Sequence, residues 1–114
     1  MTGVELIAAE RKRQIEKEGW TQEHDKEHET GDLALAAICY AAPVPVFILS
    51  EDPDYHEFYD PWPWSEDWDK RQREADTREL IPAKDMPVAW RIRNLVKAGA
   101  LIAAEIDKLQ NEVK

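Results

Sequence analysis

The hydrophobic positions at the start of the chain repeat with the period of an α-helix. They recur at helical spacing and share their face with one arginine: Val4, Ile7, Ala8, Arg11 and Ile15. Thr2 and Glu5 have the spacing of a capping box, and the glycine at position 19 is typical of a helix C-terminus. The sequence therefore predicts a first helix over about residues 3–18.

A second hydrophobic segment, Leu33–Ala42, is apolar on nearly every side. A helix of this composition is normally buried. Thr30 is the expected N-cap, and Asp32 lies where the helix dipole favours an anion. Pro43 and Pro45 should end the helix because proline cannot donate the backbone hydrogen bond that continues it. We therefore predict a short helix at the centre of the fold.

Residues 43–84 lack a sustained hydrophobic period. Residues 46–49 are expected to be extended, and residues 50–60 carry several carboxylates without any Lys or Arg. The run Pro61-Trp62-Pro63-Trp64 favours extended backbone. Ser65 is the expected cap of a short helix over residues 66–75, and residues 76–84 should be irregular. This part of the chain is predicted to be an acidic, tryptophan-rich excursion from a helical core.

The longest hydrophobic repeat lies near the C-terminus. Its spacings alternate between four and three residues, as in a seam that packs along another helix: Val88, Ile92, Leu95, Gly99, Ile102, Ile106, Leu109 and Val113. Asp85 is the expected cap, and Pro87 is expected in the first turn. Gly99 should permit a close backbone approach. Packing within the chain and a homo-oligomer would each cover this seam.

Length and composition agree with one small helical domain. The chain has 114 residues, of which 43% are hydrophobic and 34% are charged, and its mean hydropathy is −0.65. We predict an all-α domain over residues 1–114, built as a bundle of three main helices with an irregular insertion at about residues 43–84. No segment approaches the roughly 20 apolar residues that span a bilayer, and no secretory signal is visible. A soluble, cytoplasmic protein is expected.

The formal net charge of −9 opposes broad binding to nucleic acid, which needs clustered Lys and Arg. A nucleotide or another phosphate ligand is still compatible with a small basic pocket. The single cysteine, Cys39, lies in an apolar run without cationic neighbours in the sequence. Such surroundings are typical of a buried, unreactive thiol.

The densest group of ionisable side chains lies between the first two helices. It contains Glu23, His24, Asp25, Glu27 and His28. If these residues form a helical turn, His24 and His28 share one face and can both reach one metal ion. Three interpretations remain open. The group is a hydrolytic metal site in which Glu23 and Asp25 are catalytic, a ligand site without metal, or a charged surface connection.

Two glutamates on the helices are further candidates for metal ligands. Magnesium binds oxygen atoms, often one or two carboxylates together with substrate phosphates. Glu10 lies beside the apolar face of the first helix, and Glu105 lies one residue from the seam. Arg11 and Lys97 are the matching candidates to bind phosphate. In the alternative interpretation the glutamates pair with Lys or Arg, and Arg11 forms a structural ion pair.

The five tryptophans are unevenly distributed. Trp62, Trp64 and Trp68 cluster beside the acidic segment, Trp20 precedes the histidine-rich segment, and Trp90 lies in the last helix. Such rings can stack on a base, which makes Trp20 a candidate ligand-binding residue. They also commonly close a small core or a subunit contact, and the sequence leaves both interpretations open.

Several short motifs at both ends of the chain form a signature that leaves most of residues 43–84 outside. They are Glu10-Arg11 with Gln14, Glu18-Gly19-Trp20-Thr21, Glu23-His24-Asp25, His28, Gly31-Asp32-Leu33-Ala34, Cys39-Tyr40-Ala41 and Leu95–Ile102. With these motifs the chain resembles a family of short phage and prophage proteins. The resemblance implies the cytoplasm of a host cell as the setting, and it implies no particular reaction.

The small size, helical make-up and acidic helices are also similar to the MazG-type nucleotide pyrophosphohydrolases. That resemblance implies a helical dimer or tetramer that splits nucleoside triphosphates with magnesium held by Glu and Asp. The E-E-x-x-E helix of that superfamily has no counterpart here. The E-x-x-D pattern occurs only within the acidic excursion, as Glu51 with Asp54, Glu57 with Asp60 and Glu66 with Asp69. The resemblance therefore implies the fold more strongly than the activity.

Together these patterns predict a phage-type helical protein that binds or acts on a nucleotide and forms a homo-oligomer. The enzymatic form of this hypothesis is a metal-dependent nucleoside triphosphate pyrophosphohydrolase, in which Mg, Mn or Zn polarises the phosphate and activates water. The alternative is a non-catalytic anti-defence protein. It would sequester a nucleotide signal, or it would block a host protein through the acidic, tryptophan-rich excursion.

Overall fold

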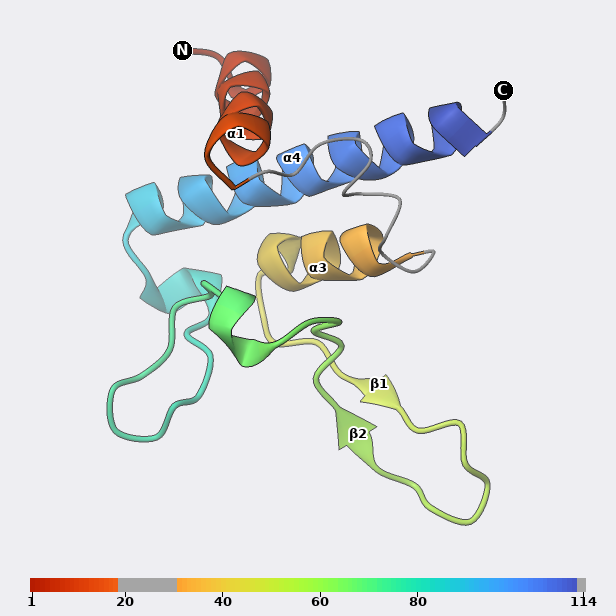
Figure 1. Ribbon diagram of the computed structural model, residues 1–114. Helices are drawn as coiled ribbons and strands as arrows, with labels where there is room; N and C mark the ends of the chain where they lie inside the picture. The colour runs from red at the N-terminus through yellow and green to blue at the C-terminus, as the bar shows by residue number, and fades with distance from the viewer. Residues whose placement is uncertain (19–30, 113–114) are drawn as a thin grey trace.

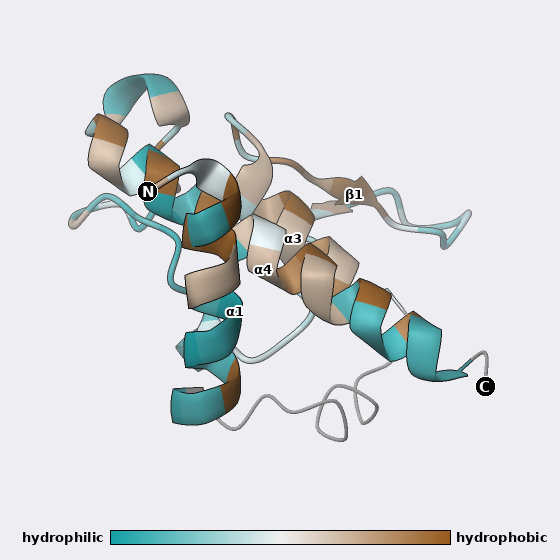
Figure 2. Ribbon diagram, turned by 90° about the horizontal axis from the view of Figure 1, so that it is seen from above, coloured by the Kyte–Doolittle hydropathy of each residue, from teal (hydrophilic) through white to brown (hydrophobic). Residues whose placement is uncertain are grey.

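The computed structural model describes residues 1–18 and 31–112, and three helices organise this part of the chain (Figure 1). α1 spans Gly3–Glu18, α3 spans Asp32–Ala41 and α4 spans Val88–Glu112. α4 lies in the middle: α3 runs antiparallel along one side of it, and α1 crosses it steeply on the other (Figures 1 and 2). The prediction of a small, mostly helical fold is confirmed.

The ends of the first two helices follow from local sequence. The backbone N–H of Thr2 donates to Glu5 Oε1 at 3.0 Å, and the N–H of Glu5 donates to Thr2 Oγ1 at 3.2 Å, which confirms the capping box. The N-cap of α3 is Gly31, with a φ of 94°, whereas the sequence predicted Thr30, which lies outside the described residues. Glycine adopts this left-handed backbone without steric cost. Ala42 is the C-cap, so α3 ends immediately before Pro43 as predicted.

The hydrophobic core lies between α3 and α4. Its buried members are at most 5% exposed, and many of them are small: Leu33, Ala36, Ala37, Tyr40, Ala98, Leu101 and Ala104. Alanines on both helices allow their backbones to approach closely. Figure 2 shows hydrophobic residues where α3 and α4 meet. Within residues 1–18 and 31–112, no helix combines the length and hydrophobicity needed to cross a membrane.

The predicted seam of α4 does not face this core. Five of its members are between 42% and 50% exposed: Ile92, Leu95, Ile102, Ile106 and Leu109. The core uses Ala98, Leu101 and Ala104 from a neighbouring face of the helix. α1 covers the seam at Gly99, which lies against Ile7. The seam therefore packs only in part within the described chain, and the homo-oligomer stays a prediction.

A hairpin makes the prediction of a purely all-α fold too strict. β1, Ile48–Leu49, pairs in antiparallel fashion with β2, Phe58–Tyr59, with Ile48 opposite Tyr59. We call residues 47–60 the hairpin arm. It projects away from the helices (Figure 1). The extended segment predicted at residues 46–49 is thus partly a strand, and its pairing partner was not predicted.

Two predicted helix boundaries are wrong. Ser65 is a cap, because its Oγ accepts from the N–H of Asp67 at 3.3 Å, but it starts a single 3-10 turn, η1 (Glu66–Trp68), instead of a helix over residues 66–75. Asp69 ends this turn, since its Oδ1 accepts from the N–H of Arg71 at 3.0 Å. Asp85 belongs to a second 3-10 turn, η2 (Ala83–Asp85), and α4 begins only after Pro87.

Candidate functional site

A pocket of about 600 Å³ lies between α1, the end of α3, the middle of α4 and the segment that follows the hairpin arm. We call that segment, residues 61–70, the tryptophan strap. Among the described residues, the lining contains four cationic side chains, four aromatic rings and three other residues: Arg13, Lys17, Lys70 and Lys97; Tyr40, Trp62, Trp64 and Trp68; Gln14, Leu101 and Asp67. Within this described part of the lining, four cations accompany one carboxylate, and Glu10 also pairs with Arg13, so the pocket carries a local excess of positive charge in a chain whose net charge is −9.

The wall from α1 carries Arg13, Gln14 and Lys17. Arg13 and Lys17 are four residues apart, so they lie on the same side of the helix. Glu10 orients Arg13, because both Glu10 carboxylate oxygens accept from Arg13 Nε, at 2.7 and 2.9 Å. Gln14 is buried, whereas Lys17 is exposed. This wall therefore offers a buried amide beside cations that reach the solvent.

α3 and α4 supply the wall opposite the strap. Tyr40, in the last turn of α3, is 5% exposed and belongs to the core. Lys97 of α4 holds its Nζ 5.3 Å from the centroid of the Tyr40 ring, a cation–π contact. Leu101 is buried one turn further along α4. The side of the pocket nearest the core is therefore apolar and aromatic, with one ammonium group next to the ring.

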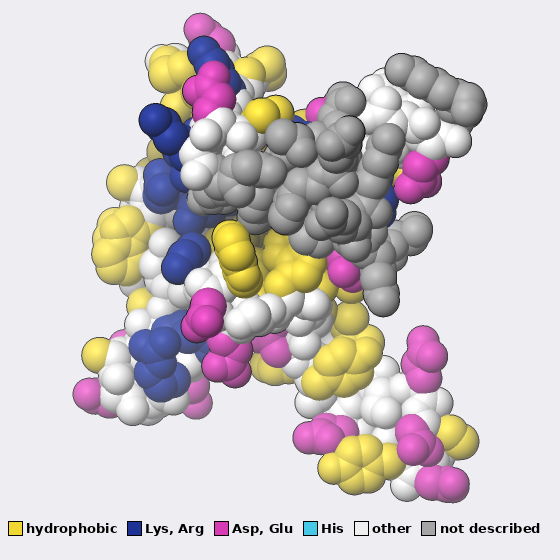
Figure 3. Space-filling view, in the orientation of Figure 1, with side chains coloured by type: hydrophobic (Ala, Val, Ile, Leu, Met, Phe, Trp, Pro, Cys, Tyr) yellow, Lys and Arg dark blue, Asp and Glu magenta, His cyan; other side chains and the backbone are white. Residues whose placement is uncertain are grey.

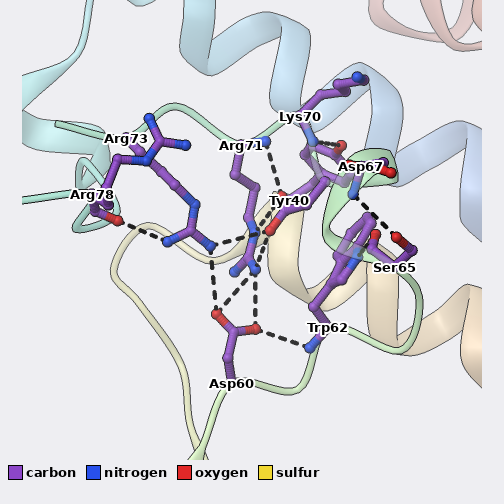
Figure 4. Close-up of polar contacts among 10 residues, drawn as sticks. Tyr40, Asp60, Trp62, Ser65, Asp67, Lys70, Arg71, Arg73 and Arg78 are labelled. Carbon is purple, nitrogen blue, oxygen red and sulfur yellow. Dashed lines mark hydrogen bonds and ion pairs between the residues drawn. The ribbon is translucent and has the colours of Figure 1, made fainter. Parts of the chain in front are cut away.

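The tryptophan strap closes the pocket with aromatic rings. Trp62 meets the Tyr40 ring edge to face at 5.7 Å, and it meets the Trp64 ring in the same way at 5.5 Å. Trp62 Nε1 donates to the carbonyl of Ser65 at 3.1 Å. The backbone N–H of Lys70 donates to Tyr40 Oη at 2.9 Å, which ties the end of the strap to α3 (Figure 4).

A buried ion cluster fixes the strap to the base of the hairpin arm (Figure 4). Arg71 is 8% exposed, and its Nη2 contacts Asp69 Oδ2 at 2.8 Å and both Asp60 oxygens at 3.0 Å. Its guanidinium also lies 5.5 Å from the centroid of the Trp62 ring. Burial disfavours the charge on Arg71, but the hydrogen bonds that it donates to Asp69 and Asp60 outweigh this effect and raise the pKa of Arg71.

The same cluster changes the Asp69 carboxyl group. Burial opposes its ionisation, but hydrogen bonds from the Arg71 side chain and backbone, together with the Arg71 charge, lower the pKa of Asp69 below its usual value. Both partners are therefore charged at neutral pH. Arg71 forms its ion pairs with carboxylates of the protein and thereby positions the strap. It is not among the cations that line the pocket.

The structure distributes the predicted phosphate-binding residues differently. Lys97 lines the pocket. Arg11 lies outside the lining: it is 8% exposed, and its Nη2 is 3.6 Å from Asp107 Oδ2 on α4. This contact matches the alternative interpretation of Arg11 as a structural ion-pair residue that stabilises the packing of α1 on α4.

Of the predicted metal ligands, two lie in the described part of the chain. Glu10 binds Arg13, as the second interpretation of the sequence expected. Glu105 is partly buried, and its Oε2 has no hydrogen-bond partner among the described residues. Residues 1–18 and 31–112 contain no group of three or more His, Cys, Asp or Glu that could hold a metal ion.

The remaining predicted site residues lie in residues 19–30, outside the described part of the chain. They are the catalytic candidates Glu23 and Asp25, the metal candidates His24 and His28, and the ligand-binding candidate Trp20. The hypothesis of a divalent metal bound by these side chains stays a prediction.

Sequence reasoning missed three of the four cations that line the pocket: Arg13, Lys17 and Lys70. The spacing of Arg13 and Lys17 on one helix face was visible in the sequence, but nothing local showed that Lys70 would lie opposite them. The space-filling view shows Lys and Arg side chains in a band that descends from α1 beside exposed hydrophobic side chains (Figure 3).

Comparison with protein-family models, curated proteins and solved structures finds no match for this chain.

Proposed function

We propose that this chain binds a nucleotide in the pocket between α1, α4 and the tryptophan strap. The observation that supports this proposal is the meeting of four cations and four aromatic rings in the lining of one pocket. Ammonium and guanidinium groups form charge-assisted hydrogen bonds with phosphate oxygens. Aromatic rings stack on bases with little regard to base identity. A nucleotide carries both a phosphate group and a base in one small molecule.

The exposure of the lining residues indicates how the ligand is oriented in the pocket. Lys17 and Lys70 are exposed, whereas Tyr40 and Leu101 are buried. A charged phosphate chain keeps part of its hydration at the mouth, and an apolar base loses water when it enters. The base therefore lies toward Tyr40 and Leu101, and the phosphates lie among the cations at the opening. A pocket of about 600 Å³ is within the size range of small-molecule sites.

The test is calorimetric titration of the whole protein with ATP, CTP, GTP, UTP and inorganic tripolyphosphate, with and without magnesium. We expect at least one nucleoside triphosphate to bind, and a Lys97→Met variant to bind it about tenfold more weakly, since hydrogen bonds to charged groups contribute about 1.5–3 kcal/mol. Lys84→Met is the matched control, because Lys84 is exposed and lies outside the pocket. Absence of binding by all five compounds contradicts the proposal.

The same samples separate sequestration from hydrolysis. Release of pyrophosphate from the bound triphosphate, dependent on Mg, Mn or Zn, would support the hypothesis of a metal-dependent pyrophosphohydrolase, with its metal ligands among Glu23, His24, Asp25, His28, Glu10 and Glu105. Binding without turnover would support the non-catalytic protein that sequesters a nucleotide signal.

A second candidate function, blocking of a host protein, is favoured by the hairpin arm. Five large apolar or aromatic side chains on the arm are between 46% and 67% exposed: Phe47, Leu49, Tyr55, Phe58 and Tyr59. The arm also carries carboxylates without Lys or Arg. At lower right in Figure 3, Asp and Glu side chains of the arm lie beside exposed hydrophobic ones. Such a surface suits a basic partner such as a DNA-binding protein.

This second function is tested with purified DNA-binding proteins at low and high salt. We expect wild type to compete with duplex DNA for one of them, and a Tyr55→Ser, Phe58→Ser variant to lose the competition while keeping its charge. If wild type and the variant compete equally well, or if neither competes, this second function is contradicted. Neither result bears on the nucleotide pocket.

A further inference from the structure

Gln14 lies in the lining of the pocket, and the role assigned to it rests on the proposed function. We propose that Gln14 reads the exocyclic amino group of adenine or cytosine in the bound nucleotide, so that the pocket binds these bases more tightly than analogues that lack only this group. Gln14 lines the pocket beside Arg13 on α1. The same turn of helix therefore supplies a cation for the phosphates and an amide for the base.

Gln14 is an unusual member of this lining. It is 3% exposed, and its Oε1 is buried without a hydrogen-bond partner among the described residues. Buried side-chain oxygens in proteins nearly always accept a hydrogen bond, and the rare exceptions call for a specific explanation. A buried acceptor without a partner, on a side chain that lines a pocket, is explained by a ligand that brings the missing donor.

The phosphate end of a nucleotide does not provide that donor. Its oxygens accept hydrogen bonds at neutral pH, and they suit the ammonium and guanidinium groups of Lys97 and Arg13. Gln14 Oε1 needs an N–H or O–H group instead. Gln14 shares the pocket lining with the Tyr40 ring and Leu101, the buried residues toward which the base is expected to lie. The donor is therefore assigned to the base.

The geometry of an amide suits the edge of a base. A glutamine side chain presents a carbonyl oxygen and an NH₂ group side by side. Adenine and cytosine present the complementary pair, an amino group next to a ring nitrogen that accepts, and a bidentate contact follows. Uracil and guanine present a ring N–H next to a carbonyl oxygen, and an amide can pair with these groups as well. The role of the amino group is therefore tested with bases that differ in that group alone. Purine without an amino group presents no donor on that edge.

The experiment uses two matched pairs of ligands in calorimetric titration of the whole protein. ATP is compared with purine riboside triphosphate, and CTP is compared with pyrimidin-2-one riboside triphosphate; each analogue lacks only the amino group. We expect wild type to prefer the amino-bearing member of each pair by about tenfold, the ratio that one lost hydrogen bond in a buried site produces. Gln14→Met has similar length without the acceptor and should reduce both ratios to about one.

Gln14→Glu keeps the acceptor oxygen, so it should retain the preference although it weakens binding of every triphosphate. Equal binding of both members of each pair by wild type overturns the role of Gln14 and leaves the proposed nucleotide site standing. A preference that persists in Gln14→Met also overturns it. If wild type binds none of the four ligands, the proposed function itself is wrong. The wild-type comparison decides the matter even if Gln14→Met does not fold.

Discussion

Gly99 of α4 lies directly against Ile7 of α1. A Cβ atom at position 99 would come within 2.5 Å of Ile7 Cδ1 and 2.8 Å of Ile7 Cγ1. The crossing of the two helices therefore depends on the absence of a side chain at this position. Because α1 carries Arg13, Gln14 and Lys17 on one wall of the pocket, the same contact sets the position of that wall.

Gly99→Ala should therefore destabilise the protein. Overpacking typically costs about 1–3 kcal/mol, and the better helix propensity of alanine returns about 1 kcal/mol, so the net loss in unfolding free energy is expected to be about 1 kcal/mol. Denaturant unfolding measures it. Gly3→Ala is the control, since no atom lies within 4 Å of a Cβ at that position. A second change, Ile7→Val, should recover part of the loss. Wild-type stability of Gly99→Ala would contradict the contact.

The helices were predictable because their signals are local. Thr2 and Glu5 specify the start of α1, and Pro43 specifies the end of α3. Gly99 within a helical repeat indicated a close approach between two helices. The pairing of β1 with β2 and the early end of η1 were not predictable in this way. They depend on contacts such as those of Arg71 with Asp60 and Asp69, which join residues whose side chains meet only after the strap has folded.

The candidate site was predictable only in part. The sequence indicated Lys97 and the tryptophans of the strap as possible ligand-binding residues. Only the tertiary structure shows that they line one pocket with Arg13 and Lys17. The seam of α4 misled in another way. The heptad spacing is real, but α3 packs on the neighbouring face of α4, where the small side chains of Ala98 and Ala104 allow a short distance between the helices.

Asp69→Asn should weaken the anchor of the strap. Arg71 would remain buried with fewer opposite charges, and breaking a buried ion pair costs about 3–5 kcal/mol. Asp60 still pairs with Arg71, so we expect a loss of about 2–3 kcal/mol in denaturant unfolding at pH 7. Asp67→Asn, which alters an exposed carboxylate in the same segment, should change stability by less than about 0.5 kcal/mol.

The sign of the pH dependence follows from Asp69. Its pKa is lower in the folded protein than in the unfolded chain, so its ionised form stabilises the fold above the unfolded pKa of about 3.9. That contribution is lost as pH falls through the folded pKa. The stability difference between wild type and Asp69→Asn should therefore be full at neutral pH and should shrink below about pH 4. A difference that grows on acidification would contradict this sign.

Cys39 should resist alkylation in the native state. The side chain is 6% exposed, and burial raises the pKa of its thiol to about 11, although the charge of Arg71 acts in the opposite direction. Little thiolate exists at pH 8, and iodoacetamide cannot reach it. Mass spectrometry should show labelling that follows unfolding in denaturant. Rapid labelling of the folded protein, at the rate of a free cysteine, would disprove the burial.

The exposed seam of α4 predicts self-association. Ile102 and Ile106 are 48% and 50% exposed, and burying such side chains in a subunit contact contributes about 25 cal/mol for each Å² of apolar surface. We expect sedimentation equilibrium to show a homo-oligomer for wild type and a monomer for Ile102→Lys, Ile106→Lys. Val44→Lys is the control, because Val44 is also exposed but does not belong to the seam of α4. A monomeric wild type would rule this association out.

Tyr40 has two separable roles in the pocket. Its hydroxyl accepts the hydrogen bond from the Lys70 backbone, and its ring contacts Trp62 and lies under the ammonium group of Lys97. Tyr40→Phe removes the first role and keeps the second. Unfolding free energy should fall by about 1 kcal/mol, the usual value of one such hydrogen bond.

Nucleotide affinity separates the roles further. The Arg71 cluster still holds the strap in Tyr40→Phe, so the affinity should fall by less than about threefold, which corresponds to roughly 0.6 kcal/mol. Tyr40→Leu also removes the ring, and it should lower both stability and affinity much more, because the ring is a wall of the pocket and a member of the core. If Tyr40→Phe and Tyr40→Leu lose affinity equally, the hydroxyl and its hold on the strap matter more than the ring. The aromatic wall would then be a support for the strap, and base stacking would have to come from Trp64 or Trp68.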